Sequence, residues 1–186
     1  MIAIGTTRKP TQRVRSFVKE LSWVIPESTR ISRGKQGFME LCESALEYGA
    51  TRILLVGAFH GNPGRLGFLD YNGETWQFIP PTIIIKAVQL GRELAPSRTR
   101  RTTQLFVLAE TSQDHQLAEL LAQALNLSMV QHDELYGIPQ KSALLYVSLR
   151  HPKTIAFLTQ DKKHPAGPKL AIKHFLTKPM GDRKRW

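Results

Sequence analysis

Apolar residues near the start of the chain repeat at the spacing of an amphipathic helix. The repeat occupies i, i+3, i+4 and i+7, at Val14, Phe17, Val18 and Leu21. This spacing predicts a helix that opens at Pro10 and turns one face to the core, after a short strand over residues 2–6. Basic side chains fall off the apolar stripe, so the exposed side of this helix is predicted to be basic.

The same helical spacing recurs at two later places in the chain. Residues 37–48 form a predicted second helix, with Gly49 placed to end it and with apolar positions Phe38, Leu41, Cys42 and Ala45. Residues 113–125 form a third, with apolar positions Leu117, Leu120, Leu121 and Ala124. Each of these helices is expected to cover part of a sheet.

Runs of β-branched and apolar residues predict the strands of that sheet. The runs are residues 52–59, 65–71, 75–79, 104–109, 144–149, 154–159 and 169–176, while residues 83–90 fit a strand or a helix. Asn62-Pro63-Gly64 has the chemistry of a tight turn, and Asn72-Gly73 favours a type I′ hairpin turn. A loop is predicted around residues 165–168.

Strand and helix patterns occur in the same order on both sides of the polar, basic stretch 96–101. We therefore expect an α/β protein in two halves, the first over about residues 1–95 and the second over about residues 102–178. Residues 179–186 have only Trp186 to bury and are expected to form a flexible basic tail.

Charge is distributed unevenly along the chain. The whole sequence carries 26 Lys and Arg against 15 Asp and Glu, a formal net charge of +11. Residues 1–35 hold eight basic and two acidic residues, and residues 162–186 hold eight and one, so the middle of the chain is slightly acidic. A surface on which the two ends meet would attract a polyanion, which makes nucleic acid the leading partner class. Two separately solvated charged segments are the alternative.

Several other classes of protein fit the sequence poorly. An apolar run of membrane-spanning length is absent, and the first ten residues lack the apolar core of a secretory signal. The single cysteine, Cys42, lies on a predicted apolar helix face, where a small buried hydrophobe is expected rather than a reactive thiol. We therefore expect a cytoplasmic protein that has no disulfides and does not bind membranes.

Motifs for cofactor or metal chemistry are also missing. The glycines match neither the phosphate-binding loop of nucleotide hydrolases nor the dinucleotide-binding pattern, and the carboxylates show no spacing that marks a general acid and base. No two histidines stand four residues apart, the six being His60, His115, His132, His151, His164 and His174. The expectation is a protein without catalytic residues, metal, cofactor or small-molecule substrate.

Two basic segments are candidates for phosphate binding. Residues 6–17 combine guanidinium groups and hydroxyls with a helix start, where free backbone N–H groups also favour phosphate. In Arg33-Gly34-Lys35, glycine lets a phosphate approach two cations. A solvated helix face and a plain loop remain the alternatives. Residues 60–65 could bring an imidazole and a guanidinium to one ligand, but we interpret them as a turn.

These segments resemble the archaeal Brix-domain family of Imp4-like ribosome biogenesis proteins. The resemblance rests on TTRKPTQRVRSF at residues 6–17, ISRGK at 31–35, HGNP at 60–63, FLD at 68–70, SLR at 148–150, FLTQ at 157–160 and GPKLAIKHF at 167–175. It spans nearly the whole chain, and residues 1–178 would form the Brix domain. Lys169 stands where arginine is common in the family, and the extensions of eukaryotic Imp4-type proteins are missing.

The resemblance implies both a fold and a function. The fold would be α/β, with two structurally similar interlocked halves, each a mixed sheet with helices, similar to the anticodon-binding domains of class II aminoacyl-tRNA synthetases. The function would be to bind ribosomal RNA or its precursor and assist its processing or subunit assembly, with ribosomal proteins or other assembly factors as further partners. The residues expected to contact RNA phosphates, in order of preference, are Arg8, Lys9, Arg13 and Arg15, then Arg33 and Lys35, then Lys169 and Lys173.

Two other functions stay open at this point. The protein could be a protein-interaction scaffold within pre-ribosomal particles, with only incidental RNA contact. It could also cleave RNA with His60 or another histidine, although no pairing of base and acid is visible in the sequence.

Overall fold

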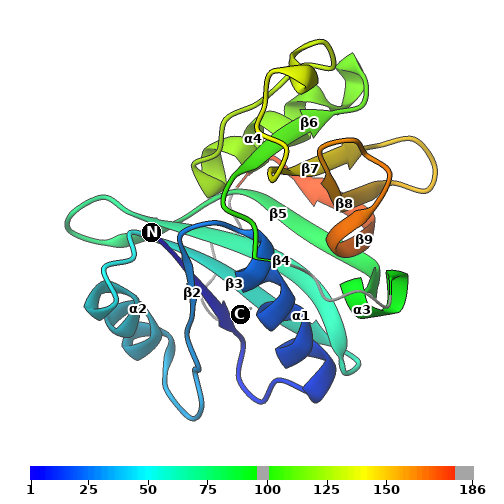
Figure 1. Ribbon diagram of the computed structural model, residues 1–186. Coiled ribbons are helices and arrows are strands. Elements are labelled where there is room, and N and C mark those ends of the chain that lie inside the picture. Colours follow the sequence, from blue (N-terminus) through cyan, green and yellow to red (C-terminus); the bar gives the residue numbers. More distant parts are fainter. Residues whose placement is uncertain (96–100, 179–186) are drawn as a thin grey trace.

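The computed structural model describes residues 1–95 and 101–178. Within these residues nine strands form one sheet, in the order β2-β1-β3-β4-β5-β9-β8-β7-β6 (Figure 1). The strands are β1 (Ile2–Thr6), β2 (Ser28–Arg30), β3 (Arg52–Phe59), β4 (Asn62–Tyr71), β5 (Trp76–Gln89), β6 (Leu105–Ala109), β7 (Ala143–Ser148), β8 (Thr154–Thr159) and β9 (Pro165–Leu176). The α-helices are α1 (Gln12–Val24), α2 (Phe38–Glu47), α3 (Gly91–Leu94) and α4 (His115–Leu125), with 3-10 turns η1 (Ser112–Asp114) and η2 (Glu134–Tyr136).

The first predicted helix forms as α1. Thr11 caps it, because its side chain accepts a hydrogen bond from the Val14 N–H. All four residues of the predicted apolar stripe are buried, including Phe17 at 0% exposure. The helix therefore packs on the sheet through the face that its sequence pattern indicates.

Helices α1 and α2 cover opposite faces of the sheet. Along β3, Leu54 and Val56 join the core cluster that contains α1, whereas Ile53 and Leu55 join the cluster that contains α2. This alternation follows from the two-residue period of a strand. Helix α4 lies on the same face as α1, since its buried residues belong to the same cluster (Figure 1).

One core runs through both halves of the described chain. Strand β5 pairs antiparallel with β9, which joins the two parts of the sheet in the middle. On either side of this junction the same order appears. A parallel pair, β1–β3 or β6–β7, is connected by a segment that contains helices, and two antiparallel pairs follow it. The expected α/β class and mixed sheet are confirmed, and the two parts share apolar residues of α1 and α4.

Two of the predicted turns differ from the structure. The tight turn lies at His60-Gly61, with φ of 46° and 80°, and not at residues 62–64, which already belong to β4. A register shift next to Gly57 in the β3–β4 pair makes room for the extra residue. The hairpin at Asn72-Gly73 forms as predicted, but the type I′ turn is wrong because only Gly73 has a positive φ. The Asn72 side chain closes that turn, because its Oδ1 accepts hydrogen bonds from the N–H groups of Glu74 and Thr75.

The loop predicted around residues 165–168 is also wrong. Strand β9 begins at Pro165, and a register shift in its pairing with β8 accommodates the proline-rich start. Residues 83–90, which fitted either a strand or a helix, continue β5 as far as Gln89. Of the predicted boundary at 96–101, the structure describes only residue 101. The predicted tail at 179–186 lies outside the described residues.

Candidate nucleic-acid interface

Three loops of the first half meet at one edge of the sheet. Strands β2, β1 and β3 are parallel, so their carboxyl ends share that edge. The chain leaves them through residues 7–11, 31–36 and 60–61. These are the segments that carry the opening motifs of the family resemblance, and the fold brings them together.

Hydroxyl groups fix these loops to one another. The Thr11 hydroxyl donates to the Gly61 carbonyl at 2.5 Å while it also caps α1. The Ala58 N–H donates to the Thr7 hydroxyl at 3.3 Å. The turn at His60-Gly61 is thus held against the start of α1, and a structural role explains its sequence without a ligand.

Arg33 is buried, which corrects the expectation of an open, cationic loop at this position. Its side chain is only 4% exposed, and its Nε donates to the Gln36 carbonyl at 3.1 Å. Burial, and then the nearby charge of Arg8, lower the pKa of the Arg33 guanidinium. Within the described chain its Nη1 has no hydrogen-bond partner. Arg33 therefore lies beneath the surface of this edge, and its Nη1 is an unused hydrogen-bond donor near Arg8.

Arg8, Lys9, Arg15 and Lys35 are exposed around the three loops, and we call these four residues the cationic edge. Within the described residues the Arg15 guanidinium donates one hydrogen bond, from its Nη2 to the Gln12 side-chain oxygen at 3.3 Å. The ion pairs within residues 1–95 and 101–178 are Arg13–Glu93 and Arg52–Asp70, so none of the four is neutralised by an acidic partner there. The cationic edge therefore presents positive charge to solvent.

Arg13 differs from its neighbours on α1. Its Nη1 lies 2.6 Å from Glu93 Oε1, and its Nη2 donates to the Val88 carbonyl at 2.9 Å. The hydrogen bond to Glu93 raises the pKa of Arg13, and the same bond, followed by one from the Leu90 N–H, lowers the pKa of Glu93. Much of the Arg13 guanidinium is thus committed to joining α1 to the segment after β5.

The C-terminal lysines lie on β9, close to where Arg13 reaches. Lys169 pairs in register with Gln89, the neighbour of Val88, so the start of α1 and the start of β9 approach the same end of β5. Lys169 faces away from α1, because the next residue, Leu170, belongs to the core that α1 covers. The basic start of α1 and Lys169 on β9 are therefore brought near each other, but on different faces of the sheet.

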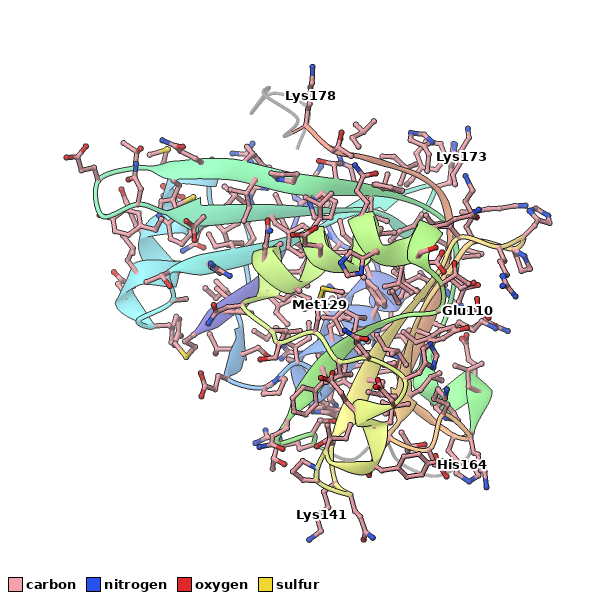
Figure 2. All side chains as sticks on the ribbon, turned by 90° about the horizontal axis from the view of Figure 1, so that it is seen from above. Glu110, Met129, Lys141, His164, Lys173 and Lys178 are labelled. Atoms are coloured by element: carbon pink, nitrogen blue, oxygen red, sulfur yellow. The ribbon has the colours of Figure 1, made fainter. Side chains whose placement is uncertain are left out.

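Lys86 is an exposed cation that the sequence analysis missed. Register shifts on both sides of the Ile85–Ile172 pair leave Lys86 on β5 and Lys173 on β9 outside the regular pairing. Both are exposed, and Figure 2 shows Lys173 pointing outward, far from Lys141. The sequence could have indicated this residue, because a lysine within a run of β-branched residues marks a position where a strand is exposed to solvent. We call Lys86, Lys169 and Lys173 the strand lysines.

A polar cluster in the second half is the strongest alternative place for chemistry. Ser148 Oγ donates to the Glu110 carboxylate, and Tyr146 bonds to the same group. Burial, and then the bond to Glu110, raise the pKa of Tyr146 to about 12. The Tyr146 phenol is therefore a neutral donor at ordinary pH. Hydrogen bonds from Ser148, and then from Tyr146, lower the pKa of Glu110, which suits a structural cluster.

The described residues contain no group of three His, Cys, Asp or Glu side chains placed to hold a metal ion. None of the helices in the described ranges has the length and apolar content to cross a membrane. The rings of His60 and Phe59 meet edge to face, with centroids 4.2 Å apart, and within the described residues the His60 imidazole makes no hydrogen bond.

Comparison with known proteins identifies the family. No family model matches the chain. The chain is 30% identical over 189 residues to a "Probable Brix domain-containing ribosomal biogenesis protein" of Methanopyrus kandleri, covering 95% of each. This chain belongs to the Brix-domain ribosome biogenesis proteins. A protein of the same name from Pyrococcus horikoshii is 28% identical over 200 residues, covering 100% of this chain and 88% of the relative.

Solved structures agree with membership of the Brix-domain family. The crystal structure of a probable ribosomal biogenesis protein from Aeropyrum pernix superposes with a TM-score of 0.72 at 30% identity, covering 96% of each chain. Mil, an archaeal Imp4-like protein, has a similar fold, with a TM-score of 0.64 at 22% identity over 93% of this chain and 97% of Mil. The family resemblance and the role in ribosome biogenesis are therefore confirmed.

Proposed function

We propose that this Brix-domain protein binds ribosomal RNA or its precursor through the cationic edge and thereby assists RNA processing or subunit assembly. The observation that carries the proposal is the convergence of three loops, which places Arg8, Lys9, Arg15 and Lys35 around one edge without acidic partners in the described chain. Such cations suit phosphates, which supply affinity and strong salt dependence but little sequence choice.

Within this proposal the predicted residues have different roles. Arg33 supports the edge from below, and its unpaired Nη1 is available to an anion that Arg8 draws in. Arg13 holds α1 in place through Glu93. The strand lysines form a second patch that a longer RNA would reach on the other face of the sheet.

The proposal describes a binding protein and not an enzyme. His60 has a structural explanation in its turn, and the cluster around Glu110 holds a neutral phenol. We also propose that the protein works in the cytoplasm with pre-ribosomal RNA, ribosomal proteins or other assembly factors. The repeated strand order is consistent with two similar halves of the anticodon-binding type, divided near residue 96.

Ultraviolet crosslinking of the purified protein to ribosomal RNA fragments, followed by mapping of the crosslinked peptides, tests the proposal. Crosslinks are expected in peptides that contain residues 7–15 and 31–36. A protein that acts as a scaffold with incidental RNA contact would crosslink weakly and without preference for these peptides. Ribosomal RNA that is cleaved during the incubation, and spared by His60→Ala, would instead support an enzyme.

A further inference from the structure

A pocket of about 530 Å³, with a lining that is part polar and part apolar, lies beside the second half of α1, away from the cationic edge. Its walls are α1, the edge strand β2 and the segment that leads into β6. The residues that line it are Lys19, Ser22, Trp23, Ile25, Pro26, Glu27, Ser28, Thr29, Arg30, Arg101, Thr102 and Thr103. The volume falls within the range of small-ligand sites, roughly 300–1,000 Å³.

Trp23 supplies an aromatic surface in this pocket. Lys19 Nζ lies 5.0 Å from the centroid of its ring, a cation–π contact, and the indole is only partly buried. The Thr102 N–H donates to the Trp23 carbonyl at 3.0 Å, so the wall opposite α1 is tied to the same residue. The pocket is thus held together by backbone contacts and not merely by mobile side chains.

The remaining lining suits a negatively charged, planar ligand. Lys19, Arg30 and Arg101 are exposed cations against one carboxylate, Glu27. Strand β2 lies at the end of the sheet order, so alternate backbone groups of Ser28–Arg30 point away from β1. The edge of a nucleobase also carries hydrogen-bond donors and acceptors, so these N–H and C=O groups are of the chemical type that such a base requires.

The pocket is connected to the cationic edge along α1. Arg15, Lys19 and Trp23 stand four residues apart and therefore share one face of the helix, with a rise of about 6 Å from each to the next. Arg15 belongs to the cationic edge, and Trp23 lines the pocket. A single strand that crosses the edge can follow this stripe into the pocket.

We infer that this pocket binds one nucleotide of single-stranded RNA, with the base stacked on Trp23 and the phosphate near Lys19, Arg30 and Arg101. The inference rests on the proposed function and adds to it a base-binding position. An RNA duplex does not fit, because its bases are stacked inside the helix, whereas an unpaired base can leave its neighbours and stack on an aromatic ring.

Tryptophan fluorescence tests the inference directly. The experiment uses the full chain with the substitution Trp186→Phe. Emission then comes from Trp23 and from Trp76, which is buried at 8% exposure. We expect a short oligouridylate to quench the emission, and a duplex of equal length to leave it nearly unchanged. Trp23→Ala is expected to weaken oligouridylate binding about tenfold, a typical loss for one stacked base.

Three further variants make the result specific. Trp23→Phe keeps an aromatic ring and is expected to retain most of the affinity, while Arg30→Glu is expected to reduce it. Lys153→Glu makes the same charge change at an exposed position beyond the opposite end of β7 from residues 101–103, and is expected to have little effect. Circular dichroism and thermal melting show whether each variant is folded, and Arg30→Glu serves as the test if Trp23→Ala is not.

The outcomes separate this inference from the proposed function. If ribosomal RNA binds and Arg8→Glu/Lys9→Glu weakens it, but oligouridylate neither quenches Trp23 nor depends on it, the pocket is not a nucleotide site. Equal quenching by the duplex also overturns the inference. If no RNA binds to any form of the protein, the proposed function fails, and the inference fails with it.

Discussion

Arg13 Nη1 lies 2.6 Å from Glu93 Oε1, and this ion pair joins residues 80 positions apart in the chain. Arg13 comes from the basic helix face that the sequence assigns to RNA, yet its guanidinium connects α1 to α3 and the end of β5. A substitution of Arg13 therefore changes the packing of α1 as well as the surface charge, and either change can alter RNA binding. Experiments on the cationic edge are therefore cleaner when they leave Arg13 unchanged.

Arg13→Ala is expected to lower the free energy of unfolding by about 1 kcal/mol, because it removes a partly exposed ion pair and the hydrogen bond to Val88. Arg15→Ala, two residues along the same helix, is expected to change it by less than about 0.5 kcal/mol. Urea denaturation of both variants measures the difference. Equal stabilities of the two variants would contradict the structural role of Arg13.

The same pair gives a dependence of stability on pH. The folded protein lowers the pKa of Glu93, so the unfolded chain takes up a proton at higher pH than the folded chain. The contribution of the pair is complete above the unfolded carboxyl pKa of about 4.3, and is lost as the pH falls through the lower folded value. The wild type should therefore lose more stability than Glu93→Gln over this acid range, as measured by urea denaturation at each pH. If the free energies of unfolding of the two proteins fall in parallel with pH, the Arg13–Glu93 pair does not cause the pH dependence.

Arg33 and Lys35 are expected to respond differently to truncation. Arg33→Ala leaves the partly buried Gln36 carbonyl without its Nε partner and is expected to cost about 1–3 kcal/mol of stability. Lys35→Ala is expected to leave stability within about 0.5 kcal/mol and to weaken RNA binding. Thermal melting and filter binding separate the two effects. Unchanged stability in Arg33→Ala would show that its side chain does not support the loop.

Tyr146 is expected to deprotonate near pH 12, which ultraviolet absorbance of the phenolate measures. Because its folded pKa lies above the unfolded value of about 10, its contribution to stability is complete below pH 10 and is lost as the pH rises toward 12. Glu110→Gln removes a nearby negative charge, so the Tyr146 pKa should fall in that variant but stay above its usual value, since burial remains. An unchanged titration curve would contradict the contact with Glu110.

Local patterns were sufficient to predict most elements of the fold. Phe17 and Leu21 are buried on α1 as their spacing predicts, and β3 has the bounds expected from its apolar run. The predictions that failed concern register shifts. Gly64 and Gly167 look like loop residues in the sequence, but each lies in a strand where a Cβ would crowd an aromatic side chain of the neighbouring strand, Phe59 and Phe157 respectively.

The candidate site was predicted in composition but not in arrangement. The sequence predicts the same phosphate-binding role for Arg8, Arg13 and, in second place, Arg33, because a guanidinium has the same chemistry at each position. Their different environments, one exposed, one paired with Glu93 and one buried, depend on contacts between segments distant in sequence. Trp23 was missed for the same reason, since its pocket forms only when residues 101–103 pack beside α1.

The salt dependence of RNA binding tests the central claim most directly. Affinity for a ribosomal RNA fragment is measured across a salt series for the wild type, for Arg8→Ala/Lys9→Ala/Lys35→Ala, and for the control Lys141→Ala. Each lost phosphate contact to a single strand lowers the log–log slope by about 0.7, so the triple variant should lose roughly 2 from the slope while the control keeps it. A triple variant with the slope of the wild type would contradict RNA binding through the cationic edge.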